Sequence, residues 1–271
     1  MSYAVSRADT LDYAPCHYGG SKLVFRGPAK STDQDYVAVI GGTETYGRFV
    51  ARPFSDLVED RLNVPVVNLG CQHAGIDAFV FDPAIMSVAK GARLTVLQVM
   101  GAQNMSNRFY RVHPRRNDRF LGPSDMLRSI YSEVDFTDFS FNRHMLSTLQ
   151  MLSLDRFSLL RDELRRAWIA RMKLIQRTID GPFLLLWLRE ELPNGLGAEP
   201  LFVGADMIAE VADQALDVIE VPVRRAGGDL EGMVYGAMQG SIAAQMLGVE
   251  THHLIAEHLS KALAEHLKTG A

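Results

Sequence analysis

Five short apolar segments constrain the fold of this chain more than any other feature of its sequence. They are YVAVIGG, VPVVNLG, RLTVLQVMG, GPFLLLWLR and LDVIEVPVR, at residues 36–42, 64–70, 93–101, 181–189 and 216–224. Short aliphatic and β-branched runs of this kind are typical of strands buried on both faces of a sheet. Helix-like sequence follows each of the first three, which predicts parallel strands with right-handed crossovers. We therefore expect an α/β fold: a flavodoxin-like three-layer sandwich around a mostly parallel five-stranded sheet.

One interruption in this rhythm predicts a helical insertion. Residues 102–142 are polar, aromatic and rich in arginine, and residues 143–179 have helical periodicity with a possible break at Ser153–Asp155. We expect a single α/β domain over residues 1–271, with an N-terminal arm over 1–34 and the insertion over 102–180. The apolar density of the 143–179 helices also suggests a homodimer surface, although core packing is the more ordinary explanation.

Composition excludes several classes of function. The net charge of −4 gives no bulk argument for binding nucleic acid, so any anion binding must be local. The two cysteines are not in a CxxC pair, and no set of His, Cys, Asp and Glu has convincing metal spacing, so we expect neither a metal nor another cofactor. The longest apolar run, residues 183–188, is too short to cross a membrane, and the N-terminus lacks a secretory signal. We expect a cytoplasmic protein.

The turn after the first predicted strand is the first candidate site. Gly41 and Gly42 allow a sharp turn, which presents Thr43, Glu44 and Thr45 above the sheet. Thr43 is either a nucleophile or, with Thr45 and nearby backbone N–H groups, part of an anion site. A helix N-cap is the plain structural alternative.

Further polar residues follow the other strands. Gly70 follows the second strand, and Asn104 and Asn107 follow the third. The carboxyl ends of parallel strands meet at one edge of a sheet, where open α/β folds bind ligands. Amide side chains there can donate hydrogen bonds to a developing oxyanion, or simply cap loops.

An arginine-rich stretch at residues 107–121 is the third candidate. It interleaves aromatic residues with six basic ones: Arg108, Arg111, His113, Arg115, Arg116 and Arg119. Guanidinium groups bind phosphate, sulfate and carboxylate through paired hydrogen bonds. We favour a site for an anionic small molecule here over a solvated loop, and ion pairs with the acidic segment 133–139 are the strongest competing explanation.

The closing helix offers a possible general base. Glu250 and His253 lie three residues apart at its start, a spacing that lets a carboxylate orient an imidazole. His252 is the adjacent alternative.

The order of these pieces resembles the SGNH (GDSL-like) hydrolase superfamily. That family has a Gly-Asp-Ser turn after the first strand, a Gly after the second, Gly-x-Asn-Asp after the third and Asp-x-x-His before the last helix. The corresponding blocks here are Gly41-Gly42-Thr43, Asn68-Leu69-Gly70, Gly101-Ala102-Gln103-Asn104 and Glu250-Thr251-His252-His253. The chain is also similar to a bacterial family marked by a Gly-Gly-Ser/Thr-Glu-Thr turn and an HPRRNDRF segment.

The resemblance implies an enzyme that hydrolyses or transfers an acyl or related group on an anionic, oxygen-rich substrate, for example a saccharide. Thr43 would then be the nucleophile, Gly70 and Asn104 the oxyanion donors, and His253 the base oriented by Glu250. Two alternatives remain open. One is a catalytically degenerate protein that only binds an anion or a partner. The other is a transferase whose donor carries a nucleotide, such as coenzyme A or a sulfated nucleotide.

Overall fold

A five-stranded parallel sheet forms the centre of the molecule in a computed structural model, which describes residues 11–190 and 195–269. The strands are β1 (Val37–Gly41), β2 (Val66–Gly70), β3 (Leu94–Gln98), β6 (Phe183–Glu190) and β7 (Asp217–Val223). Their order is β2-β1-β3-β6-β7, and every neighbouring pair is parallel. The predicted flavodoxin-like α/β fold is confirmed, since this is the strand order of a doubly wound sheet.

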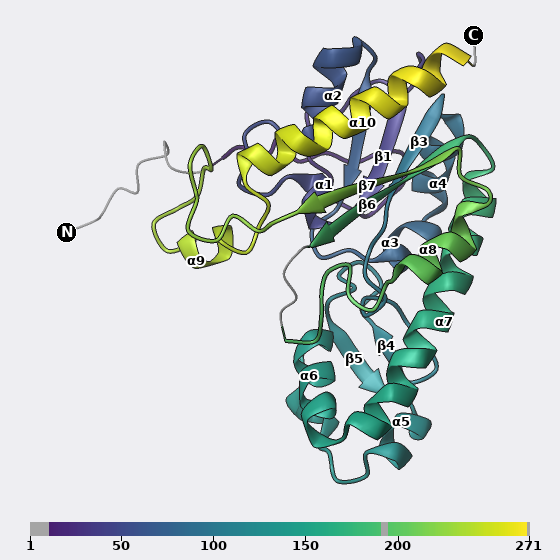
Figure 1. Cartoon of the computed structure of the whole chain (residues 1–271), viewed down its shortest axis with the longest axis vertical. Helices are drawn as coiled ribbons and strands as arrows, with labels where there is room; N and C mark the ends of the chain where they lie inside the picture. Colours follow the sequence, from purple (N-terminus) through teal and green to yellow (C-terminus); the bar gives the residue numbers. More distant parts are fainter. Residues whose placement is uncertain (1–10, 191–194, 270–271) are drawn as a thin grey trace.

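Helices cover both faces of the sheet (Figure 1). On one face lie α2 (Phe54–Leu62) and α10 (Val249–Thr269), which pack on each other. On the other lie α3 (Ile76–Val80), α4 (Pro83–Gly91), α7 (Leu154–Ile179) and α8 (Ala205–Ala212). Two short helices, α1 (Thr43–Tyr46) and α9 (Gly240–Ala243), belong to connecting segments.

The side chains of β1 show why its segment has no polar position. Val37 and Val39 join the core under α2 and α10, whereas Ala38 and Ile40 join the core on the opposite face. Because successive side chains of a strand point to opposite faces, a central strand of a three-layer fold must be apolar throughout.

The insertion forms a lobe below the sheet (Figure 1). It contains an antiparallel hairpin of β4 (Tyr110–Val112) and β5 (Phe120–Pro123), then α5 (Asp125–Ile130), a 3₁₀ turn (Phe136–Asp138) and α6 (Asn142–Leu152). The break expected at 153–155 is present, because Ser153 ends α6 and caps α7. Helix α7 is shared: its first turns pack on α6 in the lobe and its last turns lie against α4 and α8 beside the sheet.

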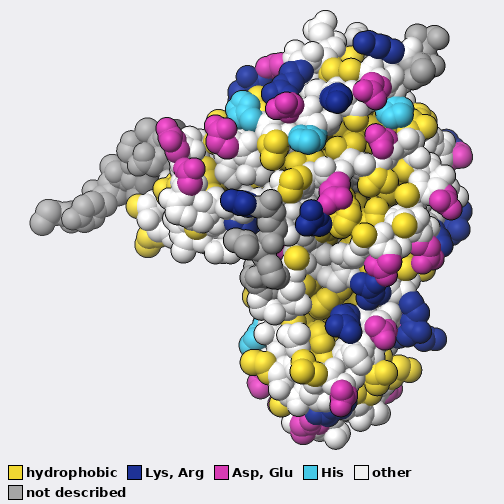
Figure 2. Space-filling view, in the orientation of Figure 1, with side chains coloured by type: hydrophobic (Ala, Val, Ile, Leu, Met, Phe, Trp, Pro, Cys, Tyr) yellow, Lys and Arg dark blue, Asp and Glu magenta, His cyan; other side chains and the backbone are white. Residues whose placement is uncertain are grey.

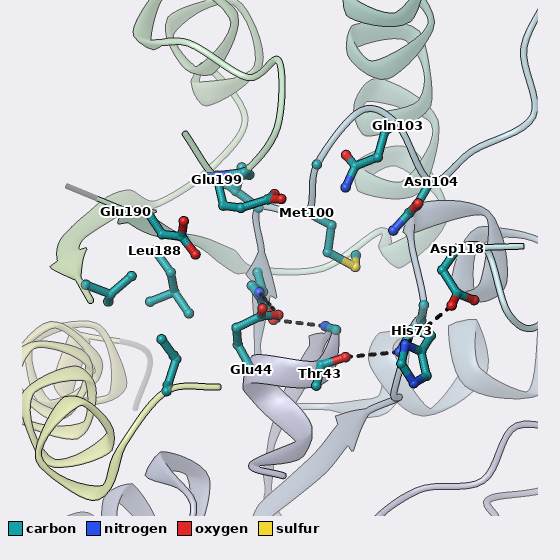
Figure 3. A pocket seen from close by; sticks show the side chains of 18 of the residues that line it. Thr43, Glu44, His73, Met100, Gln103, Asn104, Asp118, Leu188, Glu190 and Glu199 are labelled. Carbon is teal, nitrogen blue, oxygen red and sulfur yellow. Dashed lines mark hydrogen bonds and ion pairs between the residues drawn. The ribbon is translucent and has the colours of Figure 1, made fainter. Parts of the chain in front are cut away.

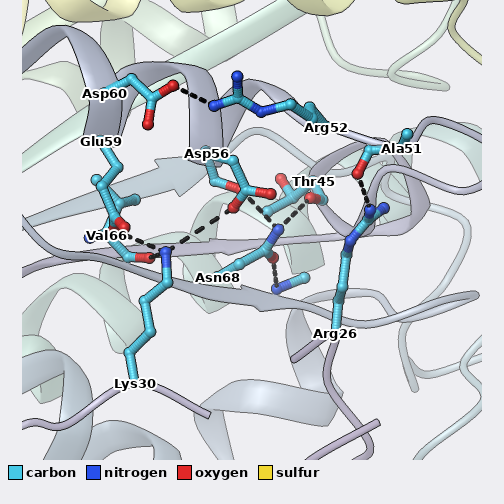
Figure 4. A network of polar contacts seen from close by, with 12 residues as sticks. Arg26, Lys30, Thr45, Ala51, Arg52, Asp56, Glu59, Asp60, Val66 and Asn68 are labelled. Atoms are coloured by element: carbon cyan, nitrogen blue, oxygen red, sulfur yellow. Dashed lines mark hydrogen bonds and ion pairs between the residues drawn. The ribbon is translucent and has the colours of Figure 1, made fainter. Parts of the chain in front are cut away.

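Described residues of the N-terminal arm pack on their own chain. The buried guanidinium of Arg26 donates hydrogen bonds to the carbonyls of Gly47, Val50 and Ala51 at 2.7, 2.8 and 2.5 Å. Figure 4 shows this side chain reaching the segment after α1, with Lys30 bound to Glu59 nearby. The arm therefore closes the segment that follows the candidate turn. The expectation about a secretory signal concerns residues 1–10, which lie outside the described residues.

Surface features bear on the remaining expectations. Over residues 11–190 and 195–269, no helix is both long and apolar enough to cross a bilayer. Apolar side chains are exposed on the lower lobe, among them Met151, Leu154 and Leu159 (Figure 2). A homodimer through this surface stays a prediction. The largest apolar cluster includes residues of the arm, the sheet and the insertion, and the organisation as a single domain stays a prediction.

Candidate active site

A cavity of about 220 Å³ lies at the carboxyl edge of the sheet. Its walls come from the turn after β1, the loops after β2 and β3, and the ends of β6 and β7. In this strand order the connections from β1 and β3 leave in opposite directions, and ligands of doubly wound folds bind at that switch point. The fold itself thus marks this cavity as the candidate site.

A buried glutamine organises the turn after β1. Oε1 of Gln98 accepts hydrogen bonds from the Gly42 N–H at 2.9 Å and from the Thr45 hydroxyl at 2.6 Å. A Cβ on Gly41 would lie 2.1 Å from Oγ1 of Thr45, so only glycine fits there. Thr45 is fully buried, and the expectation that it contacts substrate is wrong because its hydroxyl holds the turn together.

Thr43 lines the cavity (Figure 3). It occupies the first position of α1, and Gly42 is the N-cap, so the hydroxyl does not cap the helix. Instead, Oγ1 of Thr43 accepts a hydrogen bond from the backbone N–H of His73 at 3.0 Å. This bond leaves the hydroxyl hydrogen available to a base or a ligand.

His73 and Asp118 form a histidine–carboxylate pair beside Thr43 (Figure 3). Nδ1 of His73 lies 3.5 Å from Oδ2 of Asp118. Burial of the ring lowers the pKa of His73 below its ordinary value; Asp118 acts in the opposite direction, and Arg116 adds to the lowering. The imidazole is therefore neutral near pH 7, with a carboxylate to orient it and to stabilise its protonated form.

The loop between the hairpin strands carries Asp118 to this position. Oδ1 of Asn117, a fully buried side chain, accepts hydrogen bonds from the N–H groups of Gly75 and Ala78 at 2.7 and 3.1 Å. The Asp118 N–H also donates to the carbonyl of His73 at 3.3 Å. The insertion is thus fastened to the loop after β2, and the pair is held from both sides.

Asn104 is the amide that reaches the cavity. Its Oδ1 accepts a hydrogen bond from Nδ2 of the buried Asn142 at 3.1 Å. That bond fixes the orientation of the amide, so its NH₂ group is turned toward the space beside Thr43 (Figure 3). Asn104 is therefore placed where its amide could donate to an oxyanion, and that role stays a prediction.

Gly70 does not share that role. Its N–H donates to Oδ1 of Asn68 at 2.8 Å, which leaves no hydrogen for a ligand. A Cβ on Gly70 would meet the backbone nitrogen of Tyr46 at 2.3 Å. The expectation of an oxyanion donor at Gly70 is wrong, because this glycine lets β2 approach the end of α1.

Charged side chains fill the opposite wall of the cavity. Arg225 lies between Glu44 and Glu190; its Nη1 is 3.2 Å from Oε1 of Glu44, and its Nε donates to Glu190. Arg143 pairs with Glu199 next to them. Burial raises the pKa of Glu44, but Arg225 and hydrogen bonds from the backbone and Gln98 outweigh it and lower the pKa overall. Glu44 is therefore a charged residue of the wall, at a position where the sequence predicted substrate contact.

The sum of these charges is negative. Among the described residues, four carboxylates line the cavity, Glu44, Asp118, Glu190 and Glu199, against the two guanidinium groups of Arg143 and Arg225. An isolated anionic substrate would meet more carboxylates than cations. The charge of this cavity therefore does not support the expected anionic substrate.

The arginines expected to bind an anion belong to the hairpin and lie outside the described lining of this cavity. Arg108 is 3.6 Å from Glu163, Arg116 is 3.8 Å from Asp118, and Arg119 stacks 4.4 Å from the centre of the Phe141 ring. Arg111 and Arg115 are exposed. Within the described parts of the chain, none of the five arginines lines the cavity. In the described lining of the cavity, these five arginines therefore do not form a phosphate clamp for a nucleotide-bearing donor.

Two further predicted contacts are turn residues. Oδ1 of Asn107 accepts from the N–H groups of Phe109 and Tyr110, at 2.8 and 3.2 Å. Nδ1 of His113 accepts from the N–H groups of Arg115 and Arg116, at 3.3 and 3.2 Å. Both side chains shape the hairpin, so their expected contact with substrate is wrong.

The predicted base on the closing helix is also misplaced. Glu250 and His253 are exposed on α10, and the described lining of the cavity includes neither. His252 is only 1% exposed; its Nδ1 accepts from the Phe54 N–H at 3.1 Å, and its ring stacks on Phe54. The first turns of α10 pack against α2, so these histidines lie away from the cavity.

The family of the chain can now be stated. A family model described as "Domain of unknown function (DUF6473)" matches residues 1–267, almost the whole length. The chain belongs to the DUF6473 family. No curated protein matches this sequence.

Solved structures resemble the DUF6473 chain only distantly. A lipase from a goat rumen metagenome shares 14% identity, with a TM-score of 0.42 over 84% of this chain and 97% of the lipase. A G-D-S-L-family lipolytic protein described as putative, from Desulfitobacterium hafniense, has 14% identity and a TM-score of 0.36 over 84% and 99% of the two chains. A salicylyl-acyltransferase from a tetracycline biosynthetic pathway has 14% identity and a TM-score of 0.37 over 87% and 57%.

Several residues of the DUF6473 site escaped the sequence analysis. They are His73, Asp118, Arg143, Glu190, Glu199 and Arg225. His73 had one usable signal, since it lies three residues beyond the end of a predicted strand. The charged residues Arg143, Glu190, Glu199 and Arg225 gave no such sequence signal, because they come from separate segments that only the fold brings together.

Proposed function

We propose that this protein is an enzyme that hydrolyses or transfers the acyl group of a neutral, oxygen-rich ester. One observation carries the proposal: a hydroxyl, a neutral imidazole paired with a carboxylate, and an oriented amide meet in one cavity at the switch point. These are the parts that nucleophilic acyl transfer requires. Thr43 is the nucleophile, His73 the base, Asp118 its orienting carboxylate and Asn104 the oxyanion donor.

The proton balance follows from these roles. His73 takes the hydroxyl proton of Thr43 as Oγ1 attacks the ester carbon, and the imidazolium then protonates the departing alcohol. Water or an acceptor alcohol repeats the sequence on the acyl-enzyme. Nδ1 of His73 faces Asp118, so Nε2 is the ring nitrogen that takes the Thr43 proton, directly or through one water molecule.

The lining favours a substrate that donates hydrogen bonds. Oδ1 of Asp118 and Oε1 of Gln103 are buried, and neither has a hydrogen-bond partner in the described parts of the chain. Unpaired buried acceptors are stabilised when a ligand hydroxyl donates to them. An acylated saccharide offers both such hydroxyls and an ester, without the negative charge that the four carboxylates would repel.

The order of the sequence blocks supports the same chemistry. Gly41-Gly42-Thr43 and Gly101-Ala102-Gln103-Asn104 resemble the nucleophile and oxyanion blocks of the SGNH hydrolases, and the fact that Thr43 and Asn104 line the same cavity supports the proposal. The histidine block of that family has no counterpart at the cavity from α10. We therefore propose that His73 takes its place.

Turnover of p-nitrophenyl acetate and butyrate tests the proposal. Thr43→Ala should lower kcat/KM by about a thousandfold or more, because the nucleophile is lost. Thr43→Ser should retain turnover, and the exposed His253→Ala is the matched control that should leave it unchanged. Equal turnover by the wild-type protein and Thr43→Ala would remove Thr43 from the mechanism.

A binding protein without turnover is the second candidate. The observation that favours it is the Gly70 N–H, which is occupied by Asn68 and so cannot stabilise an oxyanion. In that case neutral saccharides should raise the melting temperature, while ester turnover is absent from wild type and Thr43→Ala alike. Turnover that depends on Thr43 would reject this candidate.

A further inference from the structure

A second and larger cavity lies beside the candidate active site. Its volume is about 850 Å³, which is within the range of small-molecule sites. Its walls come from the N-terminal arm, the junction of α3 and α4, the hairpin and Arg171 of α7. A smaller hollow connects the two regions: it shares His73 with the candidate active site, and Lys22 and Arg115 with the second cavity.

The walls of this second cavity are largely apolar. Leu23 and Val112 lie on the sides, and the rings of Phe81, Pro83 and Pro114 present flat surfaces. The side chain of Phe81 is 62% exposed, although it follows directly on the buried helix α3. A large exposed aromatic ring within a concave surface is a feature of ligand sites, where it can stack on a planar group.

The floor of the second cavity is polar but its charges are balanced. The buried carboxylate of Asp77 accepts a hydrogen bond from the Ser106 N–H at 2.8 Å, and its Oδ1 lies 3.1 Å from Nε of Arg171. The guanidinium of Arg171 also lies 4.7 Å from the centre of the Phe81 ring. The Asp77–Arg171 pair therefore places a guanidinium against the Phe81 ring, and the two charges of the pair balance each other.

The rim of the second cavity has the opposite character. Lys22 comes from the arm and Arg115 from the hairpin, and both are exposed. Neither forms an ion pair with any residue over 11–190 and 195–269. Asp82 also lines this cavity, but its carboxylate accepts hydrogen bonds from the Ser21 hydroxyl and the Ala84 and Ile85 N–H groups, so within the described residues it forms no ion pair with either cation.

We infer that this second cavity binds an organic anion with a flat apolar body: the body stacks between Phe81 and the proline rings, and its carboxylate, sulfate or phosphate lies between Lys22 and Arg115. This site is separate from the proposed reaction centre and does not depend on it. Arg115 of the arginine-rich stretch at residues 107–121 would then bind an anion in the second cavity and not at the candidate active site.

Isothermal titration calorimetry with the full chain tests this inference, using 2-naphthoate and its uncharged counterpart 2-naphthamide as probes. We expect 2-naphthoate to bind about tenfold or more tightly than the amide, because only the acid forms charge-assisted hydrogen bonds. Arg115→Glu and Lys22→Glu should each weaken 2-naphthoate by about tenfold, and Phe81→Ser should weaken both probes. Melting curves verify that these exposed substitutions leave the fold intact.

Two matched variants make the inference falsifiable. Arg111→Glu removes an exposed arginine of the same hairpin that does not line the second cavity, and Thr43→Ala changes the proposed reaction centre. Both should bind 2-naphthoate as the wild type does. Absence of 2-naphthoate binding, equal affinity for the amide, or equal loss in Arg111→Glu or Thr43→Ala would overturn the site.

Discussion

The carboxyl edge of the sheet and the layer formed by α2 and α10 each contain a neutral histidine, but for different reasons. His73 lies in a cavity, with a carboxylate 3.5 Å from Nδ1. His252 lies in a dry interface, where it accepts a backbone hydrogen bond and stacks on Phe54. Burial is the largest cause of the lowered pKa of both rings, and for His252 the value falls to about 3. A lowered pKa alone therefore does not distinguish a base from a packing residue; access and a partner carboxylate do.

The largest effect should appear when the histidine of the carboxyl edge is removed. His73→Ala should lower ester turnover by about a hundredfold to ten-thousandfold, the usual contribution of a general base. His252 and His253 lie away from the cavity, so His253→Ala should leave kcat unchanged. Steady-state kinetics on a p-nitrophenyl ester measures both, and equal losses in the two variants would break the contrast between the regions.

Removing the histidine of the α2–α10 layer should change stability instead. His252→Ala leaves a void beside Phe54 and an unsatisfied Phe54 N–H, which should lower the free energy of unfolding by about 2–4 kcal/mol. Urea denaturation measures this difference. The free energy of unfolding of the exposed variant His253→Ala should stay within about 0.5 kcal/mol of the wild type. If His253→Ala lost as much stability as His252→Ala, the stacking of His252 on Phe54 would not be the cause of the loss.

The pH dependence of the free energy of unfolding should show the contribution of the buried His252. The folded pKa of His252, about 3, lies below its ordinary unfolded value, so the unfolded chain binds the extra proton as pH falls. The contribution of His252 is fully present above about pH 6.5 and is lost toward pH 3, at about 1.4 kcal/mol per pH unit. Urea midpoints between pH 7 and pH 4 should show a shallower decline in His252→Gln; an unchanged slope would contradict the assignment.

The smallest effect is expected at the exposed arginines of the hairpin. Arg108 is 71% exposed in its side chain and lies 3.6 Å from Glu163. An exposed ion pair of this kind stabilises little, so Arg108→Ala should change the free energy of unfolding by less than about 0.5 kcal/mol. A thermal melt in low and high salt measures it. A loss above about 1 kcal/mol would mean that the hairpin arginines are structural after all.

The sheet was predictable because its signal is local. Val37 to Ile40 must be apolar on both faces, β2 and β3 are likewise buried at every position, and the edge strand β7 alternates buried and exposed positions within a few residues. The β4–β5 hairpin was missed because its strands have three and four residues and alternate with exposed positions such as Arg111. A pattern so short gives no period to detect.

The candidate site was only partly predictable for the same reason. Thr43 lies just beyond β1 and Asn104 lies in the loop after β3, so the strand order implied that both lie near the carboxyl edge. The pairing of His73 with Asp118 joins two loops far apart in sequence, and nothing local announces it. Glu250 and His253 have the spacing of a catalytic pair, but the spacing does not say which side of α10 is buried.

Helix α7 sets a rule for how this protein can change in length during evolution. Arg156 at its lower end donates to the carbonyl of Ile130 in the lobe, whereas Gln176 at its upper end donates to the carbonyl of Val211 beside the sheet. One added residue between them would rotate every lobe contact by about 100° relative to the sheet. Natural insertions and deletions in this family should therefore gather in the hairpin and the α5–α6 segment, and those within α7 should come in steps of about seven residues, two full turns.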